Sequence, residues 1–108
     1  MGVLKLEPRK TDVGTLSADR DNAVQIVLVN EGDAPLTISR IVSTKFDVEY
    51  YDAGDSGGME IAPGQTLKTT LQVKPPEKGR FLDTILIYSD ARNDIGNGYK
   101  GLLSGTVE

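Results

Sequence analysis

Short runs of Val, Ile, Leu and Thr, separated by glycine and proline, are the feature of this sequence that most restricts its fold. In residues 66–73 every second side chain is of the kind that faces a core: Leu67, Thr69, Leu71 and Val73. A period of two is the period of a β-strand, and such runs with turn signals about every 8–12 residues are typical of a sandwich. No segment keeps the period of an amphipathic helix. The sequence therefore predicts an all-β fold, an antiparallel β-sandwich of about seven to eight strands.

The strand expected at residues 23–30 is apolar on both faces. Val24, Ile26 and Leu28 form one face, and Val27 and Val29 make the other face apolar as well. A strand with two apolar faces belongs at the centre of a sheet or beneath a neighbouring domain. Its second face is therefore a candidate surface for contact with another part of a larger protein.

Two further segments have less regular patterns. Residues 11–14, with the sequence Thr-Asp-Val-Gly, are typical of a turn. Phe46, Val48 and Tyr50 alternate with acidic residues, which predicts a half-buried strand. In such a strand the adjacent Tyr50 and Tyr51 would point to opposite faces.

Turn residues divide the strands. Residues 30–33 (Asn-Glu-Gly-Asp) predict a tight turn because Asn and Gly tolerate positive φ, and residues 62–65 (Ala-Pro-Gly-Gln) fit a type II turn. Pro35 suits a position where no backbone N–H is needed for pairing with a neighbouring strand. Gly105, near the end of the last strand, allows a backbone or a large side chain to approach closely. The residues expected to determine the fold are Asn30, Gly32, Pro35, Pro63, Gly64 and Gly105.

With 108 residues the chain has room for one domain. We expect residues 1–10 to form an N-terminal strand at a boundary or linker, and residues 11–108 to form the domain. Because Met1 and Gly2 lead directly into strand-like sequence, we expect that a leader or neighbouring domains precede this segment in a longer protein.

Composition excludes several classes of site. The chain has neither cysteine nor histidine, so it lacks disulfides, thiolate metal sites and the commonest general base. Twelve basic and sixteen acidic residues give a net charge of −4 and form no basic cluster. This balance argues against binding to nucleic acid or to an anionic membrane, and no apolar run approaches the length of a membrane span. No cofactor is expected.

Five sequence segments occur in a fixed order that resembles one superfamily. They are residues 12–16 (Asp-Val-Gly-Thr-Leu), 29–38 (Val-Asn-Glu-Gly-Asp-Ala-Pro-Leu-Thr-Ile), 61–65 (Ile-Ala-Pro-Gly-Gln), 79–85 (Gly-Arg-Phe-Leu-Asp-Thr-Ile) and 103–107 (Leu-Ser-Gly-Thr-Val). Together they resemble the Hydin-like (ASH) immunoglobulin-like modules, which are related to the major sperm protein fold. The most similar pattern is that of a bacterial family of domains of unknown function. The resemblance implies immunoglobulin-like topology and a periplasmic or extracellular location.

One departure from that pattern limits what can be carried over. Many bacterial members have a Cys-Gly-Cys motif after the strand that corresponds to residues 36–42. Here the segment reads Ser43-Thr44-Lys45-Phe46. Any redox or metal chemistry of that motif is therefore not expected in this chain.

Acidic side chains are the first candidates for a binding site. They are densest between residues 47 and 60, where Asp52 and Asp55 lie beside flexible glycines and could supply oxygens to a hard cation. The alternative is that these side chains are simply solvated. The loop at residues 89–98 lacks the order of ligands of a calcium loop, but its length makes Asn93 and Asp94 candidates for contact with a partner.

Tyrosine is the other candidate. An exposed Tyr51 beside carboxylates could stack on a sugar ring or anchor a protein interface. The proposed binding residues are Tyr51, Asp52, Asp55, Asn93 and Asp94. Because the sequence has no phosphate loop, nucleophile elbow or metal-ligand spacing, we expect no enzyme. The sequence favours a non-catalytic structural or protein-interaction module, and the resemblance to Hydin-like modules implies that it belongs to a larger, exported bacterial protein. The alternative is a carbohydrate-binding module.

Overall fold

The computed structural model describes residues 2–91 and 98–108. Over these ranges the chain forms nine strands and no helix, so no helix is present that could cross a membrane. The strands are β1 (Leu4–Leu6), β2 (Lys10–Leu16), β3 (Asn22–Asn30), β4 (Leu36–Ser43), β5 (Val48–Asp52), β6 (Met59–Ile61), β7 (Thr66–Val73), β8 (Gly79–Ser89) and β9 (Tyr99–Val107). The predicted all-β fold is confirmed.

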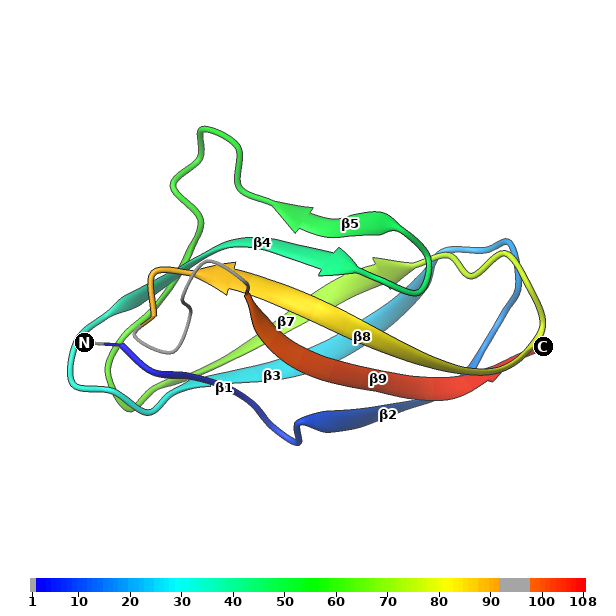
Figure 1. Ribbon diagram of the computed structural model, residues 1–108, viewed down its shortest axis with the longest axis horizontal. Coiled ribbons are helices and arrows are strands. Elements are labelled where there is room, and N and C mark those ends of the chain that lie inside the picture. Colours follow the sequence, from blue (N-terminus) through cyan, green and yellow to red (C-terminus); the bar gives the residue numbers. More distant parts are fainter. Residues whose placement is uncertain (1, 92–97) are drawn as a thin grey trace.

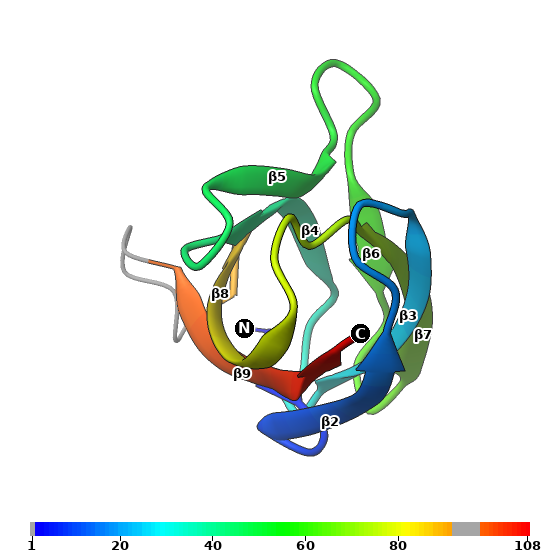
Figure 2. The ribbon, with the colours of Figure 1, turned by 90° about the vertical axis from the view of Figure 1, so that its right-hand side faces the viewer.

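The strands form two sheets that enclose a core (Figure 1). The smaller sheet has the order β1-β3-β7, and the larger has the order β2-β9-β8-β4-β5, with β6 also paired to β4. All pairs are antiparallel except β2 with β9, which is parallel. Seen from its end, the molecule is a rounded sandwich in which β2 and β5 lie at the two edges of the larger sheet (Figure 2).

The sequence predicts a turn at residues 11–14, but the structure has no turn between strands there. These residues lie inside β2, where the pairing with β9 shifts between Asp12 and Thr15. Gly14 has a φ of 74°, and its N–H donates a 2.8 Å hydrogen bond to the side chain of Asp12. The turn-like residues therefore make a bulge in a strand rather than end one.

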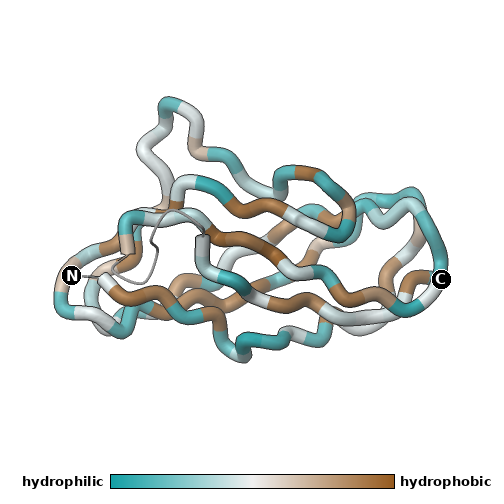
Figure 3. Tube along the Cα trace, in the orientation of Figure 1, coloured by the Kyte–Doolittle hydropathy of each residue, from teal (hydrophilic) through white to brown (hydrophobic). Residues whose placement is uncertain are grey.

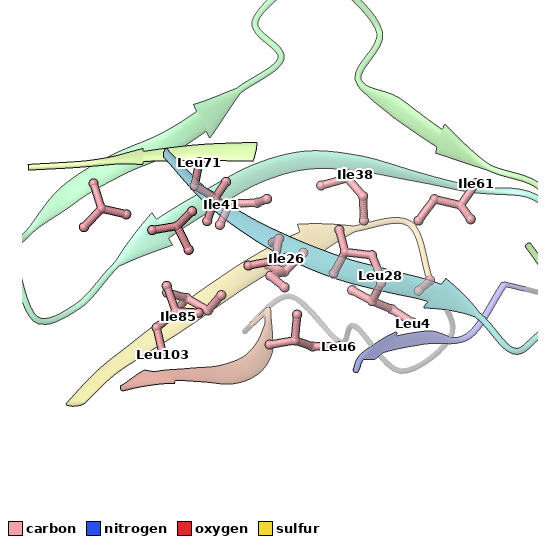
Figure 4. Close-up of a cluster of buried hydrophobic side chains, with 14 of the residues drawn as sticks. Leu4, Leu6, Ile26, Leu28, Ile38, Ile41, Ile61, Leu71, Ile85 and Leu103 are labelled. Carbon is pink, nitrogen blue, oxygen red and sulfur yellow. The ribbon is translucent and has the colours of Figure 1, made fainter. Parts of the chain in front are cut away.

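Aliphatic side chains from both sheets fill the core (Figure 4). In Figure 3 the hydrophobic stretches lie mainly in the strands, whereas the loops and the edge strand β2 are largely hydrophilic. Leu4 and Leu6 of β1 are part of this core, and β1 pairs with β3. Core side chains that are at most 1% exposed include Leu6, Ile26, Leu28, Leu36, Ile38, Ile41, Ile85, Ile87 and Leu103.

Strand β3 takes the central place in the smaller sheet that its two apolar faces predicted. Val24, Ile26 and Leu28 are buried against the larger sheet, whereas Val27 and Val29 on the other face are half-buried. The chain itself therefore covers part of the second face of β3.

Strand β5 departs from the predicted alternation. Phe46 lies in the turn before the strand, Asp47 has a φ of 54°, and Val48 is 48% exposed. Tyr51 pairs with Ile41 while Glu49 pairs with Val42. The residue between them, Tyr50, is thus an extra residue in a bulge. Tyr50 and Tyr51 consequently both pack against the core, and the prediction that one would face outward is wrong.

Candidate functional site

The predicted binding residues that the structure describes lie at one end of β5. Tyr51 is half-buried and packs against the core. Asp52 is exposed and accepts a 2.9 Å hydrogen bond from the N–H of Gly54, and Asp55 is exposed in the following loop. Asn93 and Asp94 lie outside the described residues.

The acidic segment 47–60 is dispersed rather than convergent. Glu49 pairs with the Nε of Arg40 at 3.0 Å, and the carboxylate of Asp52 closes its own turn. Over residues 2–91 and 98–108, no three His, Cys, Asp or Glu side chains come together in a way that could hold a metal ion. These carboxylates are engaged locally or face the solvent.

The fold-determining residues take part in close local contacts. Asn30 is fully buried at the end of β3. Its side-chain oxygen accepts from the N–H groups of Val3 and Gly32 at 3.1 and 2.9 Å. Its amide nitrogen donates to the carbonyls of Ala34 and Ile61 at 2.8 and 2.9 Å. Asn30 thus ties β1, the β3–β4 connection and β6 together by its side chain rather than by a positive φ.

Two other fold-determining residues, one in a turn and one in β9, also have defined surroundings. Gly64 has a φ of 73°, and the N–H of Gln65 donates to the carbonyl of Ala62 at 3.0 Å, as in a closed β-turn. A Cβ on Gly105 would lie 2.6 Å from the carbonyl oxygen of Gly14 and 3.1 Å from the ring of Phe81. The last strand therefore has no room for a side chain at residue 105.

A buried carboxylate, which the sequence had not singled out, lies at the other end of β4. Asp83 of β8 has no exposed surface. Its Oδ2 accepts hydrogen bonds from the hydroxyls of Ser43 at 2.9 Å and Tyr50 at 2.7 Å. Its Oδ1 accepts from the N–H of Lys45 at 3.1 Å. With three hydrogen-bond donors, this buried carboxylate has the partners that a buried polar group needs.

This network fixes the turn that joins β4 to β5. Besides the bond from Lys45 to Asp83, the N–H of Phe46 donates to Ser43 Oγ at 2.9 Å, and the Thr44 hydroxyl donates to the carbonyl of Thr84 at 2.6 Å. Burial, and secondarily the neighbouring Asp83, raises the pKa of Tyr50 well above its usual value of 10.0. The phenol therefore stays protonated and keeps donating to Asp83.

The outward face of the larger sheet carries apolar side chains, of which Leu82 is exposed and the others are half-buried. Because Asp83, Ile85 and Ile87 point inward, the alternate residues of β8 point outward. Leu82 among them is 53% exposed. We call the outward residues Val42, Leu82, Leu86 and Leu102 the aliphatic stripe.

The aliphatic stripe is continuous across three strands. Val42 of β4 lies opposite Leu86 of β8, and Leu102 of β9 lies opposite Thr84, diagonal to both Leu82 and Leu86. Diagonal neighbours on one face are about 7–8 Å apart at their Cα atoms, within reach of aliphatic side chains.

Polar residues and two hollows border the stripe. A hollow of about 520 Å³ lies over β2, β8 and β9 and includes Lys10, Arg80 and Leu82 in its lining. A second, of about 470 Å³, lies over β4 and β5 and includes Arg40, Val42 and Val48. An apolar strip with a polar rim on an open sheet face is an arrangement suited to contact with a large, flat partner.

Comparison with known proteins identifies the fold. No family model matches the sequence, and no curated protein matches it. Solved structures do match over almost the whole chain. PapD-like domain 7 of human CEP192, an ASH/PapD-like domain, has a TM-score of 0.58 at 12% identity, with 97% of this chain and 84% of that chain covered.

Two further matches come from an archaeon and a nematode. The CARDB domain of the PF1109 protein from Pyrococcus furiosus gives a TM-score of 0.60 at 9% identity, covering 99% of this chain and 89% of that one. The major sperm protein family member WR4 from C. elegans gives 0.53 at 8% identity, with each chain covered fully. The chain thus has an immunoglobulin-like sandwich similar to those of ASH, CARDB and major sperm protein modules. The sequence resemblance to ASH and major sperm protein modules had implied this fold.

The same fold also forms part of longer chains. In the Vibrio cholerae VesB protease the match has a TM-score of 0.53 at 8% identity and covers 97% of this chain but only 31% of that chain. Modules of this type therefore occur both alone and as one domain among others, including within enzymes.

Proposed function

We propose that this domain is a non-catalytic protein-interaction module of a larger protein, and that the aliphatic stripe is its contact surface. The observation that carries the proposal is the outward exposure of Leu82 within a continuous row of aliphatic side chains. Burying apolar area is the main favourable term in protein association, and a sheet face presents such area without any change of the fold.

The aliphatic stripe replaces the surface that the sequence suggested for this role. Val27 and Val29 are half-buried, as are Val42, Leu86 and Leu102 of the aliphatic stripe. The difference is Leu82, which is 53% exposed and has no counterpart on the outer face of β3. Contact with a neighbouring domain or partner is therefore better supported on the larger sheet than on β3.

The geometry supports protein contact better than carbohydrate binding. Tyr51 is half-buried and packs against the core, so only part of its ring is open to stack on a sugar. The rings of Tyr88 and Tyr99 are covered by the guanidinium groups of Arg40 and Arg9, at 5.3 and 5.6 Å from the ring centroids. Binding on a glycan array that is lost in Tyr51→Ala would instead favour the carbohydrate function.

Site-specific photocrosslinking in the native cells tests the proposal. A photoreactive amino acid would replace Leu82 in the full-length protein, and a matched control would carry it at Thr70, an exposed position on β7 of the other sheet. We expect a discrete crosslinked product from position 82 that is absent from position 70. Equal products from both positions, or none from position 82, would overturn the assignment.

A further inference from the structure

A pocket at one end of the sandwich is distinct from the aliphatic stripe. It has a volume of about 320 Å³ and lies where the β4–β5 turn, the β7–β8 connection and the end of β9 meet. Figure 2 views the molecule from this end. We call it the end pocket, and the residues that matter here are Lys45, Phe46, Lys78, Arg80, Phe81 and Val107.

The end pocket has an aromatic wall. The rings of Phe46 and Phe81 are 5.7 Å apart between centroids and tilted by 54°. Both rings are half-buried and pack against the core, so their positions are fixed by the fold. Val107 of β9 adds an aliphatic surface. An apolar group in the pocket would therefore find a preformed place to pack.

The mouth of the pocket is basic, although the whole chain carries a net charge of −4. Lys45, Lys78 and Arg80 line it, against a single carboxylate, Glu77. All four side chains belong to exposed residues. In the described part of the chain, the ion pairs involve Lys5 and Arg40 and none of these three cations. Their charges are available to an anion.

The buried Asp83 holds one side of this pocket in place. The N–H of Lys45 donates to Asp83 Oδ1 at 3.1 Å, and the N–H of Phe46 donates to Ser43 Oγ, which itself donates to Asp83 Oδ2. The turn that carries a cation and an aromatic ring of the pocket is thus attached to β8. Asp83 acts as a positioning residue, and such preorganisation reduces the entropy lost on binding.

From these features we infer that the end pocket binds an aromatic or aliphatic carboxylic acid. The carboxylate would lie among Lys45, Lys78 and Arg80, where charge-assisted hydrogen bonds are strongest, and the apolar body would pack on Phe46 and Phe81. The volume is at the lower end of about 300–1,000 Å³ for small-molecule sites. It suits one ring or one side chain, as a free acid or as the C-terminal residue of a polypeptide.

An NMR titration of the folded domain with phenylacetate tests this inference, with the neutral phenylacetamide as the matched probe. Backbone amide shifts should be confined to the segments 44–46 and 77–81 and to Val107. Phenylacetamide should bind about tenfold more weakly because it lacks the charge. Affinity for the acid should fall severalfold between about 50 mM and about 500 mM salt. Equal affinity for both probes, or shifts spread over other surfaces, would overturn the inference.

Variants assign the binding to these residues. Lys78→Gln and Arg80→Gln should each weaken phenylacetate binding about fivefold or more, whereas the control Lys68→Gln, on β7 of the other sheet, should bind as the wild type does. Retained affinity in both pocket variants would contradict the inference. A short peptide ending in Phe, compared with its C-terminal amide, then shows whether the pocket accepts a polypeptide end or only a free acid.

Discussion

Buried polar side chains organise both ends of this sandwich. Asn30 joins β1, β6 and the β3–β4 connection at one end, and Asp83 holds the β4–β5 turn at the other. Each side chain makes at least three hydrogen bonds away from water. Each therefore contributes more to the free energy of unfolding than a typical exposed polar residue does, because its removal would leave several buried partners unpaired.

Truncating Asn30 should be costly because its partners would be left unpaired. We expect Asn30→Ala to lower the free energy of unfolding by about 2–4 kcal/mol, measured by urea denaturation. The control is Glu31→Ala, next in the chain, whose 4.0 Å ion pair with Lys5 is exposed and should matter by less than about 0.5 kcal/mol. Similar losses in the two variants would show that Asn30 does not have this role.

The Asp83 network should show a graded response. Asp83→Ala leaves three donors without their acceptor and should cost about 3 kcal/mol or more. Tyr50→Phe removes one hydroxyl and should cost only about 1 kcal/mol. The ratio of the two losses, again from urea denaturation, is the diagnostic. If Tyr50→Phe were as damaging as Asp83→Ala, the phenol rather than the carboxylate would be the centre of the network.

The raised pKa of Tyr50 gives stability a pH dependence. Burial, and then Asp83, favours the protonated phenol in the folded state, whereas an unfolded Tyr titrates near 10.0. This contribution is therefore fully present below about pH 10 and is lost as the pH rises toward the higher folded pKa. Between about pH 9 and about pH 11 the wild type should lose more stability than Tyr50→Phe. Parallel losses would contradict this.

The two buried residues differ in how visible they are in the sequence. Asn30 was identified as a turn residue, but its contribution comes from side-chain bonds to segments up to 31 residues away, which local patterns do not report. Asp83 occupies an inward position between Phe81 and Ile85. An acid in that place violates the alternation, and this violation was the available signal for a buried polar network.

At the scale of elements, strands with an even period were more predictable than bulged ones. Strands β3, β7 and β9 follow an even period, so their inward residues could be read directly from the sequence. In β4 the buried Ile38 and Ile41 are three residues apart, because its pairing with β8 shifts between Ile38 and Arg40. In β2 and β5 an extra residue shifts the register. After such a shift the alternation changes phase, and the sequence pattern assigns side chains to the wrong face.

The contact between β9 and β2 can be tested at Gly105. A methyl group there would lie 2.6 Å from the Gly14 carbonyl oxygen and 2.8 Å from Val13 Cγ2, so β2 must move. Gly105→Ala should cost about 1–3 kcal/mol and should speed hydrogen exchange of the β2 amides. Ser104→Ala, on the adjacent outward position, should leave both unchanged. Unaltered exchange in Gly105→Ala would show that β2 tolerates the added methyl group.

At the scale of the whole molecule, the two packed sheets bury one set of aliphatic residues between them and leave another set on the outer face of the larger sheet. The same strand, β8, contributes Ile85 and Ile87 to the core and Leu82 and Leu86 to the aliphatic stripe. The inward set was predictable from periodicity. The aliphatic stripe was not, because it depends on which strands lie next to β8 in the larger sheet, and that order is a property of the tertiary fold.

The most direct test of the proposed function separates contact from folding at Leu82. Because Leu82 is 53% exposed, Leu82→Glu should change the free energy of unfolding by less than about 0.5 kcal/mol. In the full-length protein, with a photoreactive residue at the neighbouring Ser104, the same substitution should abolish the crosslink to the partner. A crosslink that survives Leu82→Glu in a fully stable domain would contradict the assignment of the aliphatic stripe as the contact surface.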